Sequence, residues 1–382
     1  MTFYREMGVR AGINARGFNT VLGGSILPPD VADAMSEAND QFVVMSEILA
    51  KSGEYVARFL GSEAAYITPG AAAGLILSSA AVMAGTDRQK MGQLPDTTGM
   101  KNEIVFQRAQ MYSYARCLTV VGARLVLVGD EKGCTTAQVE AAIGPRTAAL
   151  AYFESSDWGP RVVPLAEMRR LATAHSVPLI LDAASRIYPL DYFRRMAQTG
   201  DLTCFGAKYI QAPNSTGIVA GRRDLVQAVA ANAFINFEEA GAEGAPLPIG
   251  RGFKVDRQEI VAVAAAVKRW FTIDHEQRLA TFDARMHVIQ QGLKRIRGVA
   301  ASAPKAPPVG PDVSLTVTVD PKTAGKTAAQ VAAELRDGDP PIWIRQTGDD
   351  LFVHVPTLND GEEKIVLDRL KAALSTRRST AA

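Results

Sequence analysis

Short apolar segments alternate with helical segments through the middle of the chain, and this alternation limits the possible folds more than any other feature. The candidate strands are "AAYI" (64–67), "EIVF" (103–106), "RLVLVG" (124–129), "TAALAYF" (147–153), "VPLILD" (177–182), "DLTCFG" (201–206) and "GIVAG" (217–221). Near-continuous apolar strands separated by helices are typical of a mostly parallel sheet covered on both faces. The sequence therefore predicts a large α/β domain.

The two ends of the chain follow other patterns. Pro28-Pro29-Asp30 opens a long amphipathic helical segment that Gly61 closes. A second helical tract begins near residue 257, and a Pro/Ala-rich break at 301–311 precedes "SLTVTV", "IWIR" and "LFVHV" with their helices. We expect residues 1–45 to form an N-terminal segment packing on the small domain. Residues 46–250 then form the large domain, and residues 251–382 form a small α+β domain.

Charge and composition exclude several classes of partner. The chain has 42 basic and 40 acidic residues, a net charge of +2, which gives no reason to expect binding to nucleic acid or to an anionic membrane. The cysteines (Cys117, Cys134, Cys204) are widely separated and the four histidines are scattered, so the spacing predicts neither disulfides nor a metal site. With no signal-peptide or membrane-spanning pattern, we expect a cytoplasmic protein.

Two charged residues stand at the ends of predicted strands. Asp182 ends "VPLILD", and Lys208 follows "DLTCFG" after one more helix and strand, so both can face a single cleft at the carboxyl edge of the sheet. A lysine in such a place can form a Schiff base with pyridoxal 5'-phosphate (PLP), and a carboxylate can keep the pyridine nitrogen of PLP protonated. The pair indicates a PLP site.

A third segment supplies a phosphate site. "TPGAAAG" (68–74) places Thr68, Gly70 and Ala71 at the start of a small-residue helix whose backbone N–H groups no bulky side chain covers. Each feature alone has an ordinary explanation, since a loop lysine is usually solvated, a strand-end aspartate often caps a helix, and small residues mostly serve packing. The order of phosphate helix, aspartate and lysine is typical of the aspartate-aminotransferase fold, fold type I.

Longer motifs narrow this further. "KYIQAPNSTGIVAGRRDLV" resembles the lysine segment of the D-glucosaminate-6-phosphate ammonia-lyase branch of the selenocysteine synthase-like family. The resemblance extends over nearly the whole chain, through "INARGFNTVLGGSILPPDVADAM", "NEIVFQR", "IGRGFKVDRQEIVAV" and "LFVHVPTLNDGEEKIV". It implies PLP as cofactor, a mostly parallel seven-stranded sheet, Lys208 and Asp182 as the catalytic pair, and a homodimer or larger homo-oligomer.

The chain departs from this family beside the cofactor. Where relatives often carry a histidine near the cofactor ring, this chain has Gln110, with Tyr112 and Tyr114 close behind, so ring stacking is either lost or passed to a tyrosine. The segment "DLTCFGAK" is also one residue shorter than its counterpart and lacks the serine that commonly precedes the lysine. Both differences can shift the substrate or the reaction.

Further residues are candidates through the resemblance, and each also fits a surface, turn or ion-pair role. The expected cofactor-binding set adds Gln110, Ser185, Ser215 and Thr216, and residues 154–156 are expected to line the same cleft. The basic residues expected to hold anionic groups of the substrate are Arg16, Arg251, Lys254 and Arg345.

The resemblance favours a PLP lyase that releases ammonia by α,β-elimination from a small hydroxylated amino acid or amino-sugar acid. Racemisation, aldol cleavage and transamination use the same cofactor and stay open as alternatives. A selenocysteine synthase-like transfer on an aminoacyl-tRNA is less favoured, because the near-neutral charge offers no basic surface for RNA and the matching region starts close to residue 1.

Overall fold

The computed structural model describes residues 2–155, 158–235, 247–304, 311 and 313–375. The chain forms two compact units, Leu27–Thr272 and Met1–Ile26 together with Ile273–Ala382. These limits differ from the domain boundaries expected after residues 45 and 250. The reason lies in α2 (Pro29–Asn39) and α11 (Arg257–Thr272), which pack on each other and so belong to the large unit.

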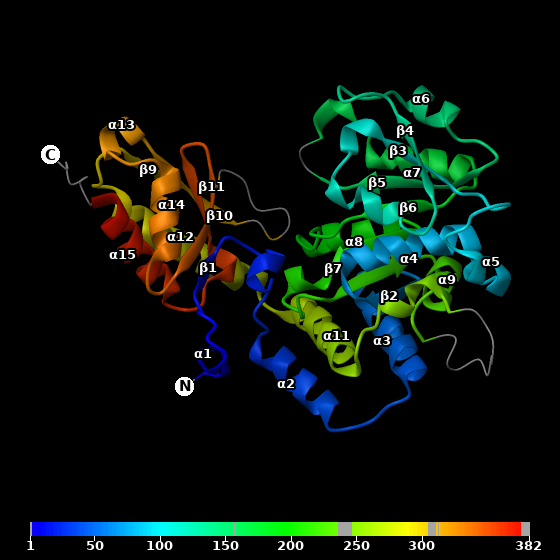
Figure 1. Cartoon of the computed structure of the whole chain (residues 1–382), viewed down its shortest axis with the longest axis horizontal. Coiled ribbons are helices and arrows are strands. Elements are labelled where there is room, and N and C mark those ends of the chain that lie inside the picture. The colour runs from blue at the N-terminus through cyan, green and yellow to red at the C-terminus, as the bar shows by residue number, and fades with distance from the viewer. Residues whose placement is uncertain (1, 156–157, 236–246, 305–310, 312, 376–382) are drawn as a thin grey trace. The chain divides into compact units, whose positions relative to one another are not determined.

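The large unit contains the predicted seven-stranded sheet, with helices packed around it (Figure 1). β8 is antiparallel to both of its neighbours, and the remaining pairs are parallel, which confirms a mostly parallel α/β fold. The order is β2-β8-β7-β6-β5-β3-β4, with β2 (Ala64–Thr68), β3 (Glu103–Gln107), β4 (Arg124–Val128), β5 (Thr147–Phe153), β6 (Leu179–Asp182), β7 (Leu202–Gly206) and β8 (Gly217–Gly221).

The amphipathic segment after Pro28 is two helices, α2 and α3 (Met45–Leu60), where the sequence predicted one. α2 ends at Asn39, and Val44, whose backbone is extended, is the N-cap of α3. α4 (Gly70–Ala84) is buried along most of its length and contacts β6, β7 and β8. The other helices of the unit are α5 (Arg88–Gln93), α6 (Thr136–Ala141), α7 (Leu165–Ala174), α8 (Leu190–Thr199) and α9 (Arg223–Ala231).

A buried aspartate joins the amino ends of the central strands. Asp201 is 7% exposed and accepts hydrogen bonds from the Leu179 amide (2.8 Å) and from Arg169 Nη1 (2.7 Å). Arg222 Nη1 lies 3.5 Å from its second carboxylate oxygen. Because two guanidinium groups neutralise this carboxylate, Asp201 serves the structure of the sheet.

The small unit is a five-stranded sheet with helices, as its predicted α+β character required. β1 (Ile13–Ala15) pairs in parallel with β11 (Ile342–Thr347), although the two strands come from opposite ends of the chain. The order is β1-β11-β12-β10-β9, with β12 (Asp350–His354), β10 (Ser314–Val319) and β9 (Val299–Ser302). Its helices are α1 (Phe3–Glu6), α12 (His275–Leu293), α13 (Pro321–Ala324), α14 (Ala328–Asp337) and α15 (Glu362–Ser375).

Two features of the small unit were not predicted. β1 and β9 have three and four residues, too few for a periodic pattern to emerge. The predicted break at 301–311 begins inside β9, and its residues 305–310 lie outside the described residues. Across the described ranges of both units, no helix has the length and apolar character that crossing a bilayer requires.

Candidate active site

The two strand-end residues lie at the ends of neighbouring strands, β6 and β7, at the carboxyl edge of the large sheet. Asp182 is the last residue of β6, and Lys208 lies in η5 (Ala207–Ile210), the turn after β7. The Ala184 amide donates to Asp182 Oδ1 (3.0 Å), and the Gly206 amide donates to the Ala184 carbonyl (2.9 Å). The loops that carry Asp182 and Lys208 are therefore joined directly.

The Asp182 carboxylate is buried without a neutralising ion pair. It is 5% exposed, and no lysine, arginine or histidine nitrogen of the described residues lies within 4.0 Å of its oxygens, in contrast to Asp201. Burial raises the pKa of Asp182, and hydrogen bonds from Tyr112 and Ala184 oppose that rise. A buried carboxylate with spare capacity to accept a donor can bind a cationic N–H group.

Lys208 is half-buried, and its Nζ lies 5.3 Å from the ring centroid of Tyr209. Desolvation lowers the pKa of Lys208 below the usual lysine value. A lowered pKa leaves more of the amine in its neutral form at a given pH. Such an amine can attack an aldehyde and can accept a proton.

A glycine-lined cradle lies at the start of α4. Gly70 has a φ of +82°, and a Cβ placed on Gly217 would lie 2.4 Å from the Gly70 carbonyl carbon and 2.7 Å from the Ala71 amide nitrogen. Pro69 provides no side-chain cap for the helix. The first N–H groups of α4 are thus open to an anion that takes the place of a cap.

Thr68, Ser215 and Thr216 surround this cradle but donate their hydroxyl protons within the protein. Thr68 Oγ1 donates to the Gly70 carbonyl (2.9 Å), and Thr216 Oγ1 donates to the Pro213 carbonyl (2.8 Å). Ser215 donates to Glu259 of α11. A phosphate bound here would compete with these acceptors for the three protons, so its main donors would be backbone amides.

Gln110 and Tyr112 have different surroundings. Gln110 is fully buried, and its side chain bonds the backbone of Phe153, with Nε2 3.0 Å from the carbonyl oxygen and Oε1 3.5 Å from the amide nitrogen. It holds the end of β5, and its contact with a cofactor stays a prediction. Tyr112 instead donates its hydroxyl to Asp182 Oδ2, and its ring stacks on Phe153 at 4.1 Å and 5°.

Tyr112 was not among the predicted cofactor-binding residues. The sequence showed only two tyrosines close behind Gln110. The hydrogen bond between Tyr112 and Asp182 joins residues 70 positions apart, so sequence spacing does not reveal it. Glu154 also lies at this edge, where it accepts a hydrogen bond from Tyr192 (2.6 Å) and its amide donates to the Asp182 carbonyl (2.9 Å). Of the predicted segment 154–156, Ser156 lies outside the described residues.

A profile of the DegT/DnrJ/EryC1/StrS aminotransferase family matches residues 33–232, more than half of the chain. The chain belongs to this family. The match spans the strands and loops that carry the cradle, Asp182 and Lys208.

Two curated relatives of this family member match almost end to end. A 5'-C-glycyluridine monooxygenase-decarboxylase of a Streptomyces species is 33% identical over 380 residues, covering 95% of this chain and 90% of the relative. A D-glucosaminate-6-phosphate ammonia lyase of Salmonella typhimurium is 29% identical over 377 residues, covering 96% of each. L-seryl-tRNA(Sec) selenium transferases, such as that of Moorella thermoacetica at 25% identity, are more distant.

A solved structure supports the same grouping. The structure of a D-glucosaminate-6-phosphate ammonia-lyase aligns with a TM-score of 0.83 at 27% identity, over 98% of each chain. This member of the DegT/DnrJ/EryC1/StrS family is therefore a PLP-dependent protein of fold type I, close to the ammonia-lyase, and both the predicted fold and the predicted cofactor are confirmed.

The residues of the site fit PLP chemically. The cofactor carries an aldehyde, a pyridine nitrogen and a phosphate, and the site offers an amine with a lowered pKa, an unpaired buried carboxylate and an open helix N-terminus in a cradle that any Cβ at Gly217 would fill. Lys208, Asp182 and the amides after Gly70 could therefore hold these three groups. Ser185 lies half-buried in the turn that follows Asp182.

The predicted basic residues fall in both units. Arg251, half-buried, and Lys254, exposed, lie in the large unit at and after η6 (Ile249–Gly252), whose Gly250 packs on Leu77 in the middle of α4. Arg16 and Arg345 lie in the small unit. Arg345 lies in β11 with its guanidinium carbon 4.4 Å from the centroid of the Phe352 ring, and Arg16 follows the last residue of β1.

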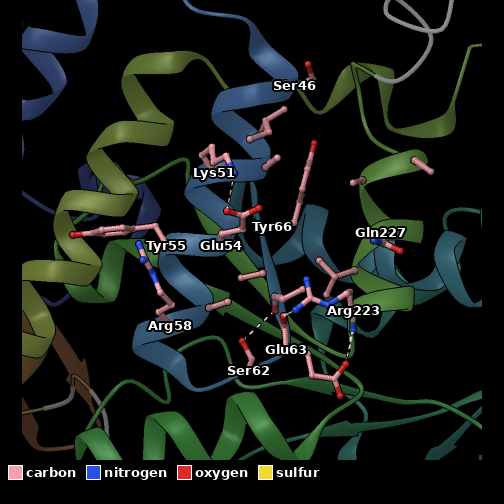
Figure 2. Close-up of a pocket in the computed structure, with 18 of the residues that line it drawn as sticks. Ser46, Lys51, Glu54, Tyr55, Arg58, Ser62, Glu63, Tyr66, Arg223 and Gln227 are labelled. Carbon is pink, nitrogen blue, oxygen red and sulfur yellow. Dashed lines mark hydrogen bonds and ion pairs between the residues drawn. The ribbon is translucent and has the colours of Figure 1, made fainter.

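A cavity of about 1100 Å³ lies apart from this site, between α3 and α9 (Figure 2). The amino end of β2 lines it, and none of the predicted site residues does. In its wall Lys51 pairs with Glu54 (3.0 Å), and the Arg223 guanidinium donates to the backbone carbonyl of Glu63 (2.7 Å), as Figure 2 shows. Within the described residues, no three His, Cys, Asp or Glu side chains gather in a way that suits a metal ion.

Proposed function

We propose that this chain is a PLP-dependent ammonia-lyase that acts on a small hydroxylated amino acid or amino-sugar acid. The observation that carries the proposal is the placement of Asp182 and Lys208 at the carboxyl ends of the neighbouring strands β6 and β7. The likeness to D-glucosaminate-6-phosphate ammonia-lyase, in sequence and in structure over nearly the whole chain, supports this reaction.

PLP, when bound, supplies an electron sink for the carbanion that forms at the substrate's α-carbon. Asp182 holds a proton at the ring nitrogen, and its buried position excludes water that would compete for that proton. The Lys208 amine accepts the α-proton, because its lowered pKa keeps a share of it neutral. The same ammonium then donates a proton to the departing β-hydroxyl, which leaves as water.

The atoms balance without a second substrate. The α C–H and β C–O bonds break, water leaves, and hydrolysis of the unsaturated amine gives a 2-oxo acid and ammonia. Arg16, Arg345, Arg251 and Lys254 are the proposed holders of carboxylate or phosphate groups, since a guanidinium fork binds such groups through two parallel hydrogen bonds.

A second reaction has support from a specific relative. The 5'-C-glycyluridine monooxygenase-decarboxylase is 33% identical, and its name describes an oxidation with loss of a carboxyl group. A monooxygenase consumes dioxygen, whereas α,β-elimination consumes none. Racemisation, aldol cleavage, transamination and selenium transfer are not favoured by the combined likeness to the ammonia-lyase.

The deciding experiment follows ammonia, 2-oxo acid, carbon dioxide and oxygen uptake for the PLP-loaded protein against a panel of hydroxylated amino acids and amino-sugar acids, with and without air. We expect equal ammonia and 2-oxo acid release in both atmospheres and from one substrate alone. Turnover that stops without air and releases carbon dioxide favours the oxidative reaction. Stoichiometric pyridoxamine phosphate without ammonia contradicts the lyase in favour of an aminotransferase.

We also propose that the protein acts in the cytoplasm as a homodimer or larger homo-oligomer. Large apolar side chains between α2 and α3 support self-association, since Phe42 is 94% exposed and Val44 is 60% exposed. The free cysteines (Cys117, Cys134, Cys204) suit a reducing compartment.

A further inference from the structure

The hydroxyl of Tyr112 meets the Asp182 carboxylate at the carboxyl edge of the large sheet. It donates to Oδ2, while the Ala184 amide donates to Oδ1 at 3.0 Å. Ring contacts hold Tyr112 in this orientation. Its ring is parallel to Phe153 at 4.1 Å and also lies near Phe106, 6.5 Å between centroids.

The other titratable groups near Asp182 do not bond its carboxylate. Burial raises the pKa of the Cys204 and Cys117 thiols, so both are neutral near pH 7. Arg186 attracts the carboxylate from a distance, and its Nε donates to the Glu154 carbonyl at 3.2 Å. Among the described residues, Tyr112 is the side chain that donates a hydrogen bond to Asp182.

A donor on each carboxylate oxygen has two consequences. It orients the carboxylate plane, and it favours the charged form over the neutral acid against the opposing effect of burial. A carboxylate that is charged and oriented is the form that can bind a pyridinium N–H group.

We propose that Tyr112 is a positioning residue that holds Asp182 as an oriented carboxylate for the ring nitrogen of PLP. The proposal rests on the PLP-binding role of Asp182 in the proposed function. It deepens that function by assigning to Tyr112 a role in cofactor affinity.

The test is a titration of the cofactor-free protein with PLP, followed by absorbance and fluorescence between pH 6 and pH 9. Tyr112→Phe keeps the ring on Phe153 and removes the hydroxyl. We expect the dissociation constant of PLP to rise about tenfold near neutral pH, which corresponds to ~1.4 kcal/mol. Because the lost donor had lowered the pKa of Asp182, the affinity of the variant should begin to fall at a higher pH than that of the wild type as the solution is acidified.

Tyr114→Phe is the matched control. Tyr114 is 59% exposed, its ring centroid is 6.1 Å from that of Tyr112, and the change deletes the same hydroxyl group. We expect its PLP affinity and pH profile to equal those of the wild type. Far-UV circular dichroism and thermal melting of each variant verify that the fold is retained.

Asp182→Asn, alone and combined with Tyr112→Phe, shows whether Tyr112 acts through Asp182. We expect Tyr112→Phe to cause little further loss of PLP affinity in the Asp182→Asn background. An equal loss in both backgrounds, an unchanged affinity, or tighter binding in Tyr112→Phe overturns the proposal. These measurements use no substrate. A protein that binds PLP with the expected pattern but releases no ammonia would therefore contradict the lyase and leave this inference intact.

Discussion

Replacing Gly217 with alanine should close the cradle at the start of α4. The new Cβ would lie 2.4 Å from the Gly70 carbonyl carbon, 2.7 Å from the Ala71 amide nitrogen and 2.8 Å from the Gly70 carbonyl oxygen. All three are backbone atoms, which cannot turn away as a flexible side chain can. To reach an ordinary contact of 3.4 Å, the first turn of α4 or the start of β8 must move by about 1 Å.

The size of the effect follows from this overlap. Adding a methyl group to a packed site costs ~1–3 kcal/mol, and the loss of unfolded-state freedom on replacing glycine returns ~0.4–1 kcal/mol. We expect a net loss of ~1–2 kcal/mol in the free energy of unfolding. For a unit of this size, that loss lowers the melting temperature by ~2–8 °C. PLP should also bind more weakly, because the amides that face the phosphate are displaced.

The assay is thermal melting of the cofactor-free protein, together with a PLP titration, and Gly144→Ala is the control. A Cβ at Gly144 meets no atom within 4 Å, and Gly144 has no positive φ. The control should melt and bind PLP as the wild type does. If Gly217→Ala melts no lower than Gly144→Ala and binds PLP equally well, the cradle is not as tight as the structure indicates and the reasoning is wrong.

Three further predictions concern the lysine, the two buried aspartates and assembly. Lys208→Ala should abolish the borohydride-stable PLP adduct found by peptide mass spectrometry, and an adduct on another lysine contradicts the assignment. Asp182→Asn should raise the unfolding free energy of the cofactor-free protein. Burial raises the pKa of Asp182 in the folded protein, so the contribution of this group to wild-type stability is complete below about pH 3.9, the usual aspartate pKa, and is lost as the pH rises through the folded-state pKa. The gain in unfolding free energy from Asp182→Asn should therefore grow over this pH range in denaturant titrations. Asp201→Asn should instead lower stability by ~1–3 kcal/mol, because the negative charge that faces Arg169 and Arg222 is lost, and equal signs for the two aspartates would refute this contrast. Light scattering should find at least a dimer, and a fully active monomer at the same concentration would exclude it.

The large sheet could be predicted because its strands are apolar on both faces. Each predicted segment from "AAYI" to "GIVAG" contains or overlaps an observed strand. The break between α2 and α3 could not be predicted in the same way. Phe42, Val43 and Val44 continue the apolar character of the helices beside them, although residues 40–44 are not helical. Apolar residues at such a turn give the same pattern as the buried face of a continuous helix.

In the candidate site too, some residues could be placed from the sequence and others could not. Asp182 and Lys208 could be placed from the sequence, because their positions relative to the strands fix which edge of the sheet they occupy. The bond between Tyr112 and Asp182 could not, because it depends on how a loop after β3 folds across the ends of β5 and β6. Gln110 stands where relatives often carry a histidine near the cofactor ring, but here its side chain bonds the Phe153 backbone.

The pairing of β1 with β11 has a consequence for the order of folding during synthesis. Ile13 is made before its partner Ile342, and the two are far apart in the chain. Every residue of the large unit is made in between, so that unit can fold first as an uninterrupted stretch of chain. β1 must wait as an unpaired strand, and the closing of this long loop carries an entropic cost. A nascent chain released before residue 342 would therefore carry a folded large unit and an unpaired β1, a species open to strand pairing with other chains.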